Sequence, residues 1–270
     1  MKYTPTPHGF QPIEITPDQY IFGSEQLQGV VLREDGQWYG WLPQIEIQRK
    51  YGLETMNCTV YGTLNCLEIL HKFHFKEEVN KSERFTGIKA GTTQNGNNPH
   101  TVAESIRKDG VVDDIMLPFS ESIDTWEKYY GPLPIASQLL KLAKEWLAGY
   151  TFGHDWVAFP GSSTAIEQKI DDMKLALRYS PLGASVHAWR EKNGLYVKQK
   201  GDSDNHWVTV YGYEDGKCWH IFDHYDNVHK KLAWNYDFGF VKRYTLTKNT
   251  VVVTNWFDAI LKRIRQFLRI

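Results

Sequence analysis

The segment SDNHWVTVYGYEDGKCWHIFDHYDN contains a histidine and an aspartate at a spacing that suits acid–base chemistry. Its alternating apolar and polar residues, at 203–227, predict two strands joined by a turn at Asp215-Gly216. Such a hairpin brings His206, at the start of the first strand, close to Asp223, at the end of the second. A histidine that is oriented by a carboxylate can serve as the general base of a nucleophile, so the pair predicts part of a catalytic site.

Cys58 is the candidate nucleophile for this pair. It lies at the start of a predicted helix, where backbone N–H groups and the helix dipole favour the thiolate, which is the attacking species. The same N–H groups could bind the oxyanion of a tetrahedral intermediate. A lone cysteine is more often a small buried apolar residue, and Cys66 and Cys218 are interpreted in that way.

The remaining histidines do not predict a metal site. His71 and His74 form an H-x-x-H pair on the helix after Cys58, but no cysteine or carboxylate pattern completes a zinc site, and solvated histidines are expected there. His220, His224 and His229 gather near Asp223, and their alternation along a strand predicts surface positions. We therefore expect no metal and no cofactor.

The elements that position these residues change in kind along the chain. Residues 1–43 read as an N-terminal arm, with a short hairpin around Asp35-Gly36. Helical periodicity then predicts helices over 57–75, 99–110, 135–150 and 162–181. After Pro181 the apolar period becomes two, and short strands are predicted over 182–190, 194–199, 206–214, 217–225, 230–236 and 240–247. Helices followed by strands indicate an α+β fold, or two lobes with a groove between them.

Several blocks of the sequence, in this order and spacing, resemble the papain family of cysteine peptidases. They are NCTVYGTLNCLEIL, QNGNNPHTVAESIRKDGVVDDIMLPFS, SPLGASVHAW, NHWVTVYGY and IFDHYD, and together they span about residues 44–246. His206 follows Cys58 by 148 residues, which fits the spacing of that family, and Asp223 follows by 165, slightly beyond it.

The resemblance implies a fold and a set of roles. The fold is a helical left lobe and an antiparallel β right lobe with the active site in the cleft between them. Cys58 would be the nucleophile and His206 the base and then the acid, and Asp223 would replace the usual asparagine. The expected substrate-binding residues are Gly96, Asn97, Asn205 and Tyr225. Of these, Gly96 and Asn97 would pair with the backbone of an extended peptide, and Tyr225 would shield the His206–Asp223 bond.

The sequence departs from the family at three places. A glutamine that completes the oxyanion hole is expected six residues before the cysteine, but position 52 is glycine. Gln48 is the favoured substitute and Gln44 the alternative. The left-lobe disulfide cysteines are missing, and no long N-terminal propeptide is recognised, so inhibition by a pro-segment is not expected.

Composition narrows the class of protein. The chain has 270 residues, 41% of them apolar, with 31 basic and 32 acidic residues and a net charge of −1, which gives no reason to expect nucleic-acid binding. Three cysteines do not indicate a disulfide framework, and neither a signal peptide nor a membrane span is recognised. The resemblance to papain-like proteins of bacteriophages and uncultured bacteria implies a cytoplasmic or virion-associated protein.

Residues 251–270 read as a separate C-terminal element. NWFDAILKRIRQFLRI is a basic amphipathic helix, predicted to dock on a partner protein or a membrane surface rather than on its own core. The peptidase domain is accordingly expected to span 44–250.

Three functions are compatible with these observations. The favoured one is a cysteine endopeptidase that acts on a peptide or protein through a thioester acyl-enzyme. Other thiol enzymes, of the NlpC/P60 amidase or transglutaminase type, usually place the histidine much closer to the cysteine. A binding or structural protein that kept the fold and lost turnover is the third.

Overall fold

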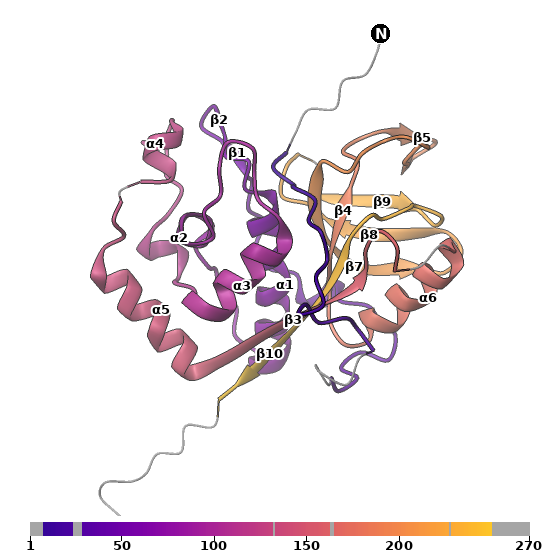
Figure 1. Cartoon of the computed structure of the whole chain (residues 1–270), viewed down its shortest axis with the longest axis horizontal. Helices are drawn as coiled ribbons and strands as arrows, with labels where there is room; N and C mark the ends of the chain where they lie inside the picture. The colour runs from indigo at the N-terminus through magenta and orange to yellow at the C-terminus, as the bar shows by residue number, and fades with distance from the viewer. Residues whose placement is uncertain (1–7, 24–28, 132, 163–164, 227, 250–270) are drawn as a thin grey trace, which may run out of the picture.

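The computed structural model of the chain describes residues 8–23, 29–131, 133–162, 165–226 and 228–249. Helices and strands lie largely in separate halves, with the helices on the left and the strands on the right in Figure 1. A continuous core of buried apolar side chains joins the two halves, with Leu64 and Leu67 from the helical side and Val208 and Val210 from the sheet. The expected α+β architecture is therefore present.

The helical half is built around α1 (Cys58–Phe75), whose residues are buried from Cys58 to His71. Burial around the whole circumference marks α1 as a central helix rather than an amphipathic surface one. His71 is therefore not solvated as expected, because its ring packs against Phe75 and Tyr150. The other helical elements are η1 (Tyr39–Trp41), α2 (Glu83–Lys89), α3 (Pro99–Asp109), η2 (Asp114–Met116), α4 (Trp126–Tyr129) and α5 (Ser137–Gly149).

Eight strands form one sheet in the order β3-β10-β4-β7-β8-β9-β6-β5. All neighbours are antiparallel except β6 and β9. The bounds are β3 (Tyr150–Ala158), β4 (Leu182–Val186), β5 (Glu191–Lys192), β6 (Leu195–Tyr196), β7 (His206–Glu214), β8 (Cys218–Phe222), β9 (His229–Ala233) and β10 (Val241–Lys248), and α6 (Ile166–Leu177) lies between β3 and β4. A separate hairpin joins β1 (Arg49–Lys50) to β2 (Leu53–Glu54).

Contact between α1 and β7 joins the two halves of the molecule. Gly62, one turn after Cys58, allows this contact because an added Cβ would lie 2.8 Å from the Trp207 ring. On the same face of the helix, the Thr209 hydroxyl donates to the Gly62 carbonyl at 3.1 Å. The start of β7, which carries His206, is thereby held against the start of α1.

The N-terminal arm does not form the predicted hairpin. Asp35-Gly36 is a turn, but the backbone N–H groups beside it donate elsewhere: Leu32 and Arg33 to the Arg178 carbonyl, and Trp38 to the Tyr211 carbonyl. Earlier in the arm, Phe22 and Tyr20 exchange backbone hydrogen bonds with Trp156. The arm thus finds its partners in distant segments, and Figure 1 shows it in indigo running between the two halves.

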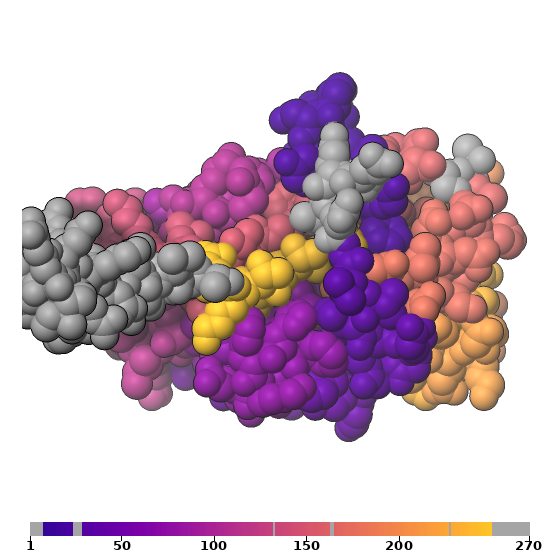
Figure 2. All heavy atoms as spheres, turned by 90° about the horizontal axis from the view of Figure 1, so that it is seen from below, coloured from indigo at the N-terminus to yellow at the C-terminus, as the bar shows by residue number. Residues whose placement is uncertain are grey.

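The last described strand, β10, reaches the molecular surface, where its yellow residues are visible from below in Figure 2. The predicted C-terminal helix over 251–270 lies outside the described residues. Within the described part of the chain, no helix combines the length and apolarity that crossing a membrane requires.

Candidate active site

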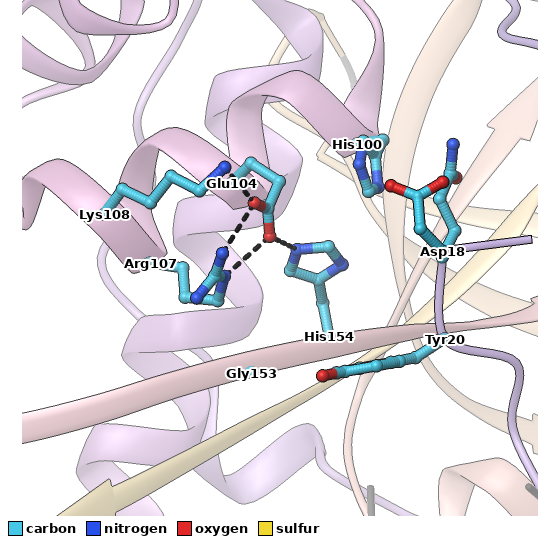
Figure 3. Close-up of a pocket in the computed structure, with 9 residues that line it drawn as sticks. Asp18, Tyr20, His100, Glu104, Arg107, Lys108, Gly153 and His154 are labelled. Carbon is cyan, nitrogen blue, oxygen red and sulfur yellow. Dashed lines mark hydrogen bonds and ion pairs between the residues drawn. The ribbon is translucent and has the colours of Figure 1, made fainter. Parts of the chain in front are cut away.

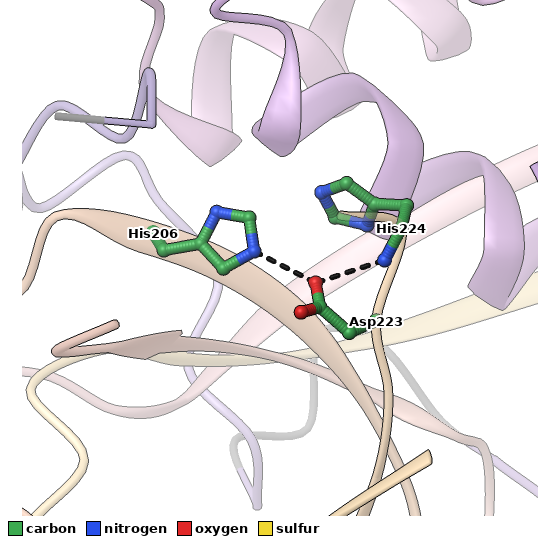
Figure 4. Close-up of side chains that lie close together, drawn as sticks. All are labelled: His206, Asp223 and His224. Carbon is green, nitrogen blue, oxygen red and sulfur yellow. Dashed lines mark hydrogen bonds and ion pairs between the residues drawn. The ribbon is translucent and has the colours of Figure 1, made fainter. Parts of the chain in front are cut away.

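His206 and Asp223 are hydrogen-bonded, as the hairpin pattern indicates. His206 begins β7 and Asp223 directly follows β8, and the distance from His206 Nε2 to Asp223 Oδ1 is 2.8 Å (Figure 4). Both side chains are fully buried. The other ring nitrogen, Nδ1, is also buried and has no hydrogen-bond partner among the described residues. The ring is therefore oriented through Nε2, and Nδ1 remains available for a reacting group.

Asp223 is held by more groups than the sequence indicates. The backbone N–H of His224 donates to its Oδ1 at 2.8 Å, and the Lys230 ammonium donates to its Oδ2 at 2.7 Å. Burial acts to raise the pKa of Asp223, but the charge and hydrogen bond of His206, with His224 and Lys230, bring the pKa below its usual range. Asp223 is therefore a carboxylate that orients His206.

Cys58 lies at the start of α1 against the residue that follows His206. Backbone N–H groups of Trp207 and Thr59 act to lower the pKa of its thiol, as expected at a helix start. Burial outweighs them and raises the pKa well above the ordinary value, with Glu54 and Asp223 adding to the effect. The thiol thus lies beside Trp207, the residue that follows His206, and is not activated in this conformation.

Gln48, rather than Gln44, lies at this site. The backbone N–H of Gln48 donates to the His224 carbonyl at 2.7 Å, and its side-chain amide donates to the His8 carbonyl at 3.0 Å. Its amide also donates to Glu54, whose carboxylate accepts the Met56 N–H as well. Gln44 is exposed and lines a different cavity. Gln48 therefore presents an amide donor to a backbone carbonyl inside the cleft.

That carbonyl belongs to the N-terminal arm, which occupies the cleft. The His8 N–H donates to the Asn205 carbonyl at 3.2 Å, the Asn97 N–H to the Gly9 carbonyl at 2.8 Å, and the Gln11 N–H to the Asn97 carbonyl at 2.9 Å. Gly96 is required beneath the arm because an added Cβ would lie 1.7 Å from the Gly9 carbonyl oxygen. Three of the four expected substrate-binding residues thus contact the chain's own backbone.

Phe10 fills an apolar pocket beside Cys58. Its ring is stacked on Trp207, with centroids 5.9 Å apart, and it belongs to one buried cluster with Cys58, Trp156 and Phe240. No local pattern predicts this contact, because it joins residues almost 200 positions apart. The arm is consequently fixed in the cleft by a buried aromatic side chain as well as by backbone hydrogen bonds.

Aromatic rings surround His206. Tyr225, the predicted shield, lies 6.1 Å from it between ring centroids and 4.4 Å from the arm residue His8, while Trp189 lies 5.8 Å from it. His224 is buried, contrary to the predicted surface position, because its ring stacks on Tyr61 of α1 at 5.2 Å.

His206, Asp223 and His224 have ligand atoms close enough to be considered as a metal centre. Asp223, however, already accepts hydrogen bonds from His206, His224 and Lys230. A cation there would have to compete with the Lys230 ammonium, so the group is better described as a hydrogen-bonded pair with a buried counter-charge.

Comparisons with solved structures identify the fold. Residues of this chain superpose on procathepsin L 3 of Tenebrio molitor larval midgut with a TM-score of 0.59 and 13% identity, covering 84% of this chain and 73% of that one. The cysteine protease xylellain from Xylella fastidiosa gives a TM-score of 0.61 and 15% identity, covering 93% and 99%. Bromelain from Ananas comosus, solved with the E64 inhibitor, gives a TM-score of 0.53 and 18% identity, covering 77% of this chain and 97% of that one.

A scan against protein-family models and a search of curated proteins each found no match. The structural likeness nevertheless assigns the class: the chain has the α+β fold of papain-like cysteine proteases. The resemblance stated from the sequence blocks is thus confirmed at the level of the fold.

Proposed function

We propose that this protein is a cysteine peptidase whose reacting groups are Cys58, His206 and Asp223. The observation that supports this most strongly is the buried His206–Asp223 pair, with an unpartnered Nδ1, at the start of a strand that packs on the helix beginning at Cys58. A papain-like fold with these residue types in these positions suits acyl transfer through a thiol.

In the proposed reaction, the Cys58 thiol gives its proton to His206 Nδ1, and the thiolate attacks the carbonyl carbon of a peptide bond. The oxyanion accepts hydrogen bonds from the Gln48 side-chain amide and the Cys58 N–H. His206 then gives its proton to the leaving amine as the C–N bond breaks. Water attacks the thioester while His206 takes one of its protons, the C–S bond breaks, and the carboxylic acid leaves as the thiol is restored.

Asp223 keeps the imidazole in the tautomer that this reaction needs. A hydrogen on Nε2 donates to the carboxylate, so the lone pair is on Nδ1. When His206 becomes an imidazolium, the same carboxylate stabilises the positive charge. Lys230 reduces this stabilisation, since its ammonium shares the carboxylate.

We further propose that the described conformation is the inactive one. The arm places the His8 carbonyl on the Gln48 amide and Phe10 beside Cys58, so a peptide can reach neither group until the arm leaves. This proposal differs from the expectation that the site is not inhibited by a pro-segment. Arm displacement would also hydrate the thiol, removing the burial that raises its pKa.

The burial of Cys58 also favours the alternative, a binding protein without turnover. A fluorescent iodoacetamide, with the labelled cysteine identified by peptide mapping, separates the two. A peptidase is expected to be labelled at Cys58 in the Phe10→Ala background and to cleave a denatured protein substrate. His206→Gln should suppress both effects, and Cys218→Ser should suppress neither. Labelling of Cys58 that does not depend on His206, without cleavage, would support the binding protein.

A further inference from the structure

A second cavity lies between the arm, α3 and β3, apart from the groups that the proposed reaction uses. It has a volume of about 270 Å³ and is lined by Asp18, Gln19, Tyr20, His100, Glu104, Arg107, Lys108, Gly153 and His154. Figure 3 shows His100 and His154 on two sides of it, with Asp18 and Tyr20 of the arm opposite α3. Its volume is near the lower end for small-molecule sites, so it suits a ligand of few atoms.

Buried nitrogen atoms at this cavity lack hydrogen-bond partners among the described residues. His154 is 6% exposed, and its Nδ1 makes no hydrogen bond, while its Nε2 is bound to Glu104 at 3.0 Å. Nδ1 of His100 is likewise buried and unpartnered, and the two rings lie 5.2 Å apart between centroids. Two of the side chains that line this cavity therefore each carry a buried ring nitrogen without an acceptor.

A third nitrogen lies behind them. Lys242 of β10 is fully buried, and its ammonium makes no hydrogen bond among the described residues, although it lies 3.6 Å from the centroid of the Trp156 ring. Its charge acts on both His100 and His154. Buried cationic and imidazole groups without acceptors are costly, and a bound acceptor would remove that cost.

The charge balance of the cavity favours an anion. Glu104, the carboxylate on α3, is already neutralised by Arg107 at 2.7 Å, Lys108 at 2.6 Å and His154. Asp18, the other carboxylate, is exposed and accepts a hydrogen bond from Thr16. Among the described residues, neither His100 nor His154 belongs to a cluster of three metal-ligating groups, and the buried Lys242 ammonium would repel a cation.

We infer that this cavity binds a small oxyanion, a carboxylate or a phosphate-type group, held by protonated His100 and His154 with Lys242 behind them. The ligand oxygens would accept hydrogen bonds from the two ring nitrogens that now lack acceptors. Because Asp18 and Tyr20 form one wall, and Tyr20 pairs with Trp156 of β3, the complete site exists only while the arm lies on the body. Oxyanion binding is thereby coupled to arm docking.

The protonation of the groups around the cavity makes oxyanion binding depend on pH. Burial, with the charge of Lys242, lowers the pKa of His100 to about 4 and that of His154 to about 3. Burial also lowers the pKa of Lys242 to about 7, against the attraction of Asp155 and Glu104. Besides these groups, Asp18, Tyr20, Arg107 and Lys108 face the cavity. An anion favours the protonated imidazoles, so binding takes up protons and strengthens as the pH falls.

The test is an NMR titration of the histidine ring signals of the full chain with sodium sulfate, whose charge is constant between pH 5.5 and 7.5. Saturable shifts of the His100 and His154 rings are expected, with about a hundredfold lower Kd at pH 5.5 than at pH 7.5 for each proton that binding takes up. Matching titrations with phosphate and with acetate show which oxyanion geometry is preferred. Sodium chloride at equal ionic strength controls for salt.

Three variants at the cavity and one control variant make the assignment specific. His154→Gln, which can still donate to Glu104, and the half-buried His100→Gln should each weaken sulfate binding about tenfold, the loss expected for one charge-assisted hydrogen bond. Asp18→Asn removes a like charge and should strengthen binding, whereas His229→Gln, at an exposed position, should change nothing. Binding that is equal in all four variants, or no saturable shift of either ring at about 50 mM sulfate, overturns the proposal.

Discussion

Replacing Phe10 by alanine tests whether the arm controls access to Cys58. The Phe10 side chain is 8% exposed and packs in the cluster that contains Cys58 and Trp207. Burial of such a ring contributes about 2 kcal/mol, which the arm loses when the ring is removed. Because 1.4 kcal/mol corresponds to a factor of ten, the population with the arm displaced should rise about 30-fold.

The assay is the rate of Cys58 alkylation by iodoacetamide at one fixed pH, followed by mass spectrometry. When arm opening is fast and the thiol reacts only in the open state, the rate follows the open population and should also rise about 30-fold. Phe22→Ala is the matched control, since Phe22 lies in the same arm but packs against Tyr179, away from Cys58. An unchanged rate in Phe10→Ala, or an equal rise in Phe22→Ala, would refute the reasoning.

Three further predictions concern stability. Gly62→Ala should lower the free energy of unfolding by about 1–3 kcal/mol in urea titrations, because its Cβ would lie 2.8 Å from the Trp207 ring. Asp223→Ala should lower it by about 3–5 kcal/mol, since the buried Lys230 ammonium loses a carboxylate partner; a smaller loss than in a surface control would contradict this. Burial, and then the charge of His206, lower the pKa of His8 from 6.5 to about 3, so the docked arm binds fewer protons than the free one. The stability from His8 is full above pH 6.5 and is lost as the pH falls towards 3, so His8→Gln should reduce the change in unfolding free energy between pH 7.5 and 5.5 by about 1 kcal/mol.

Local patterns predicted most of the elements. The helix 57–75 and the strand 206–214 are found as Cys58–Phe75 and His206–Glu214, because apolar spacing and turn residues act over short distances. The edge strand β3 was missed, although it follows the helix α5 directly. Its pairing with β10, about 90 residues later, is what defines it as a strand, and a local pattern carries little information about such a partner.

At the candidate site, too, local patterns predicted one contact and missed those that depend on distant segments. The hairpin register brings His206 and Asp223 together, so their contact follows from residues 17 positions apart. Lys230 and Glu54 were not predicted at the site, because a charged residue in a strand or loop is usually exposed. Only the assembled molecule buries Lys230 beside Asp223 and directs Glu54 to Gln48.

What the sequence by itself determined is the set of candidate reactive groups: a cysteine at a helix start, and a histidine and an aspartate on one hairpin. What the tertiary structure decided is whether those groups can be reached. Residues 8–11 cross the cleft, pair with Asn97 and Asn205 and raise the pKa of the Cys58 thiol by contributing to its burial. The physical reason is that thiol reactivity depends on hydration and neighbouring charge, which are set by segments far away in the chain.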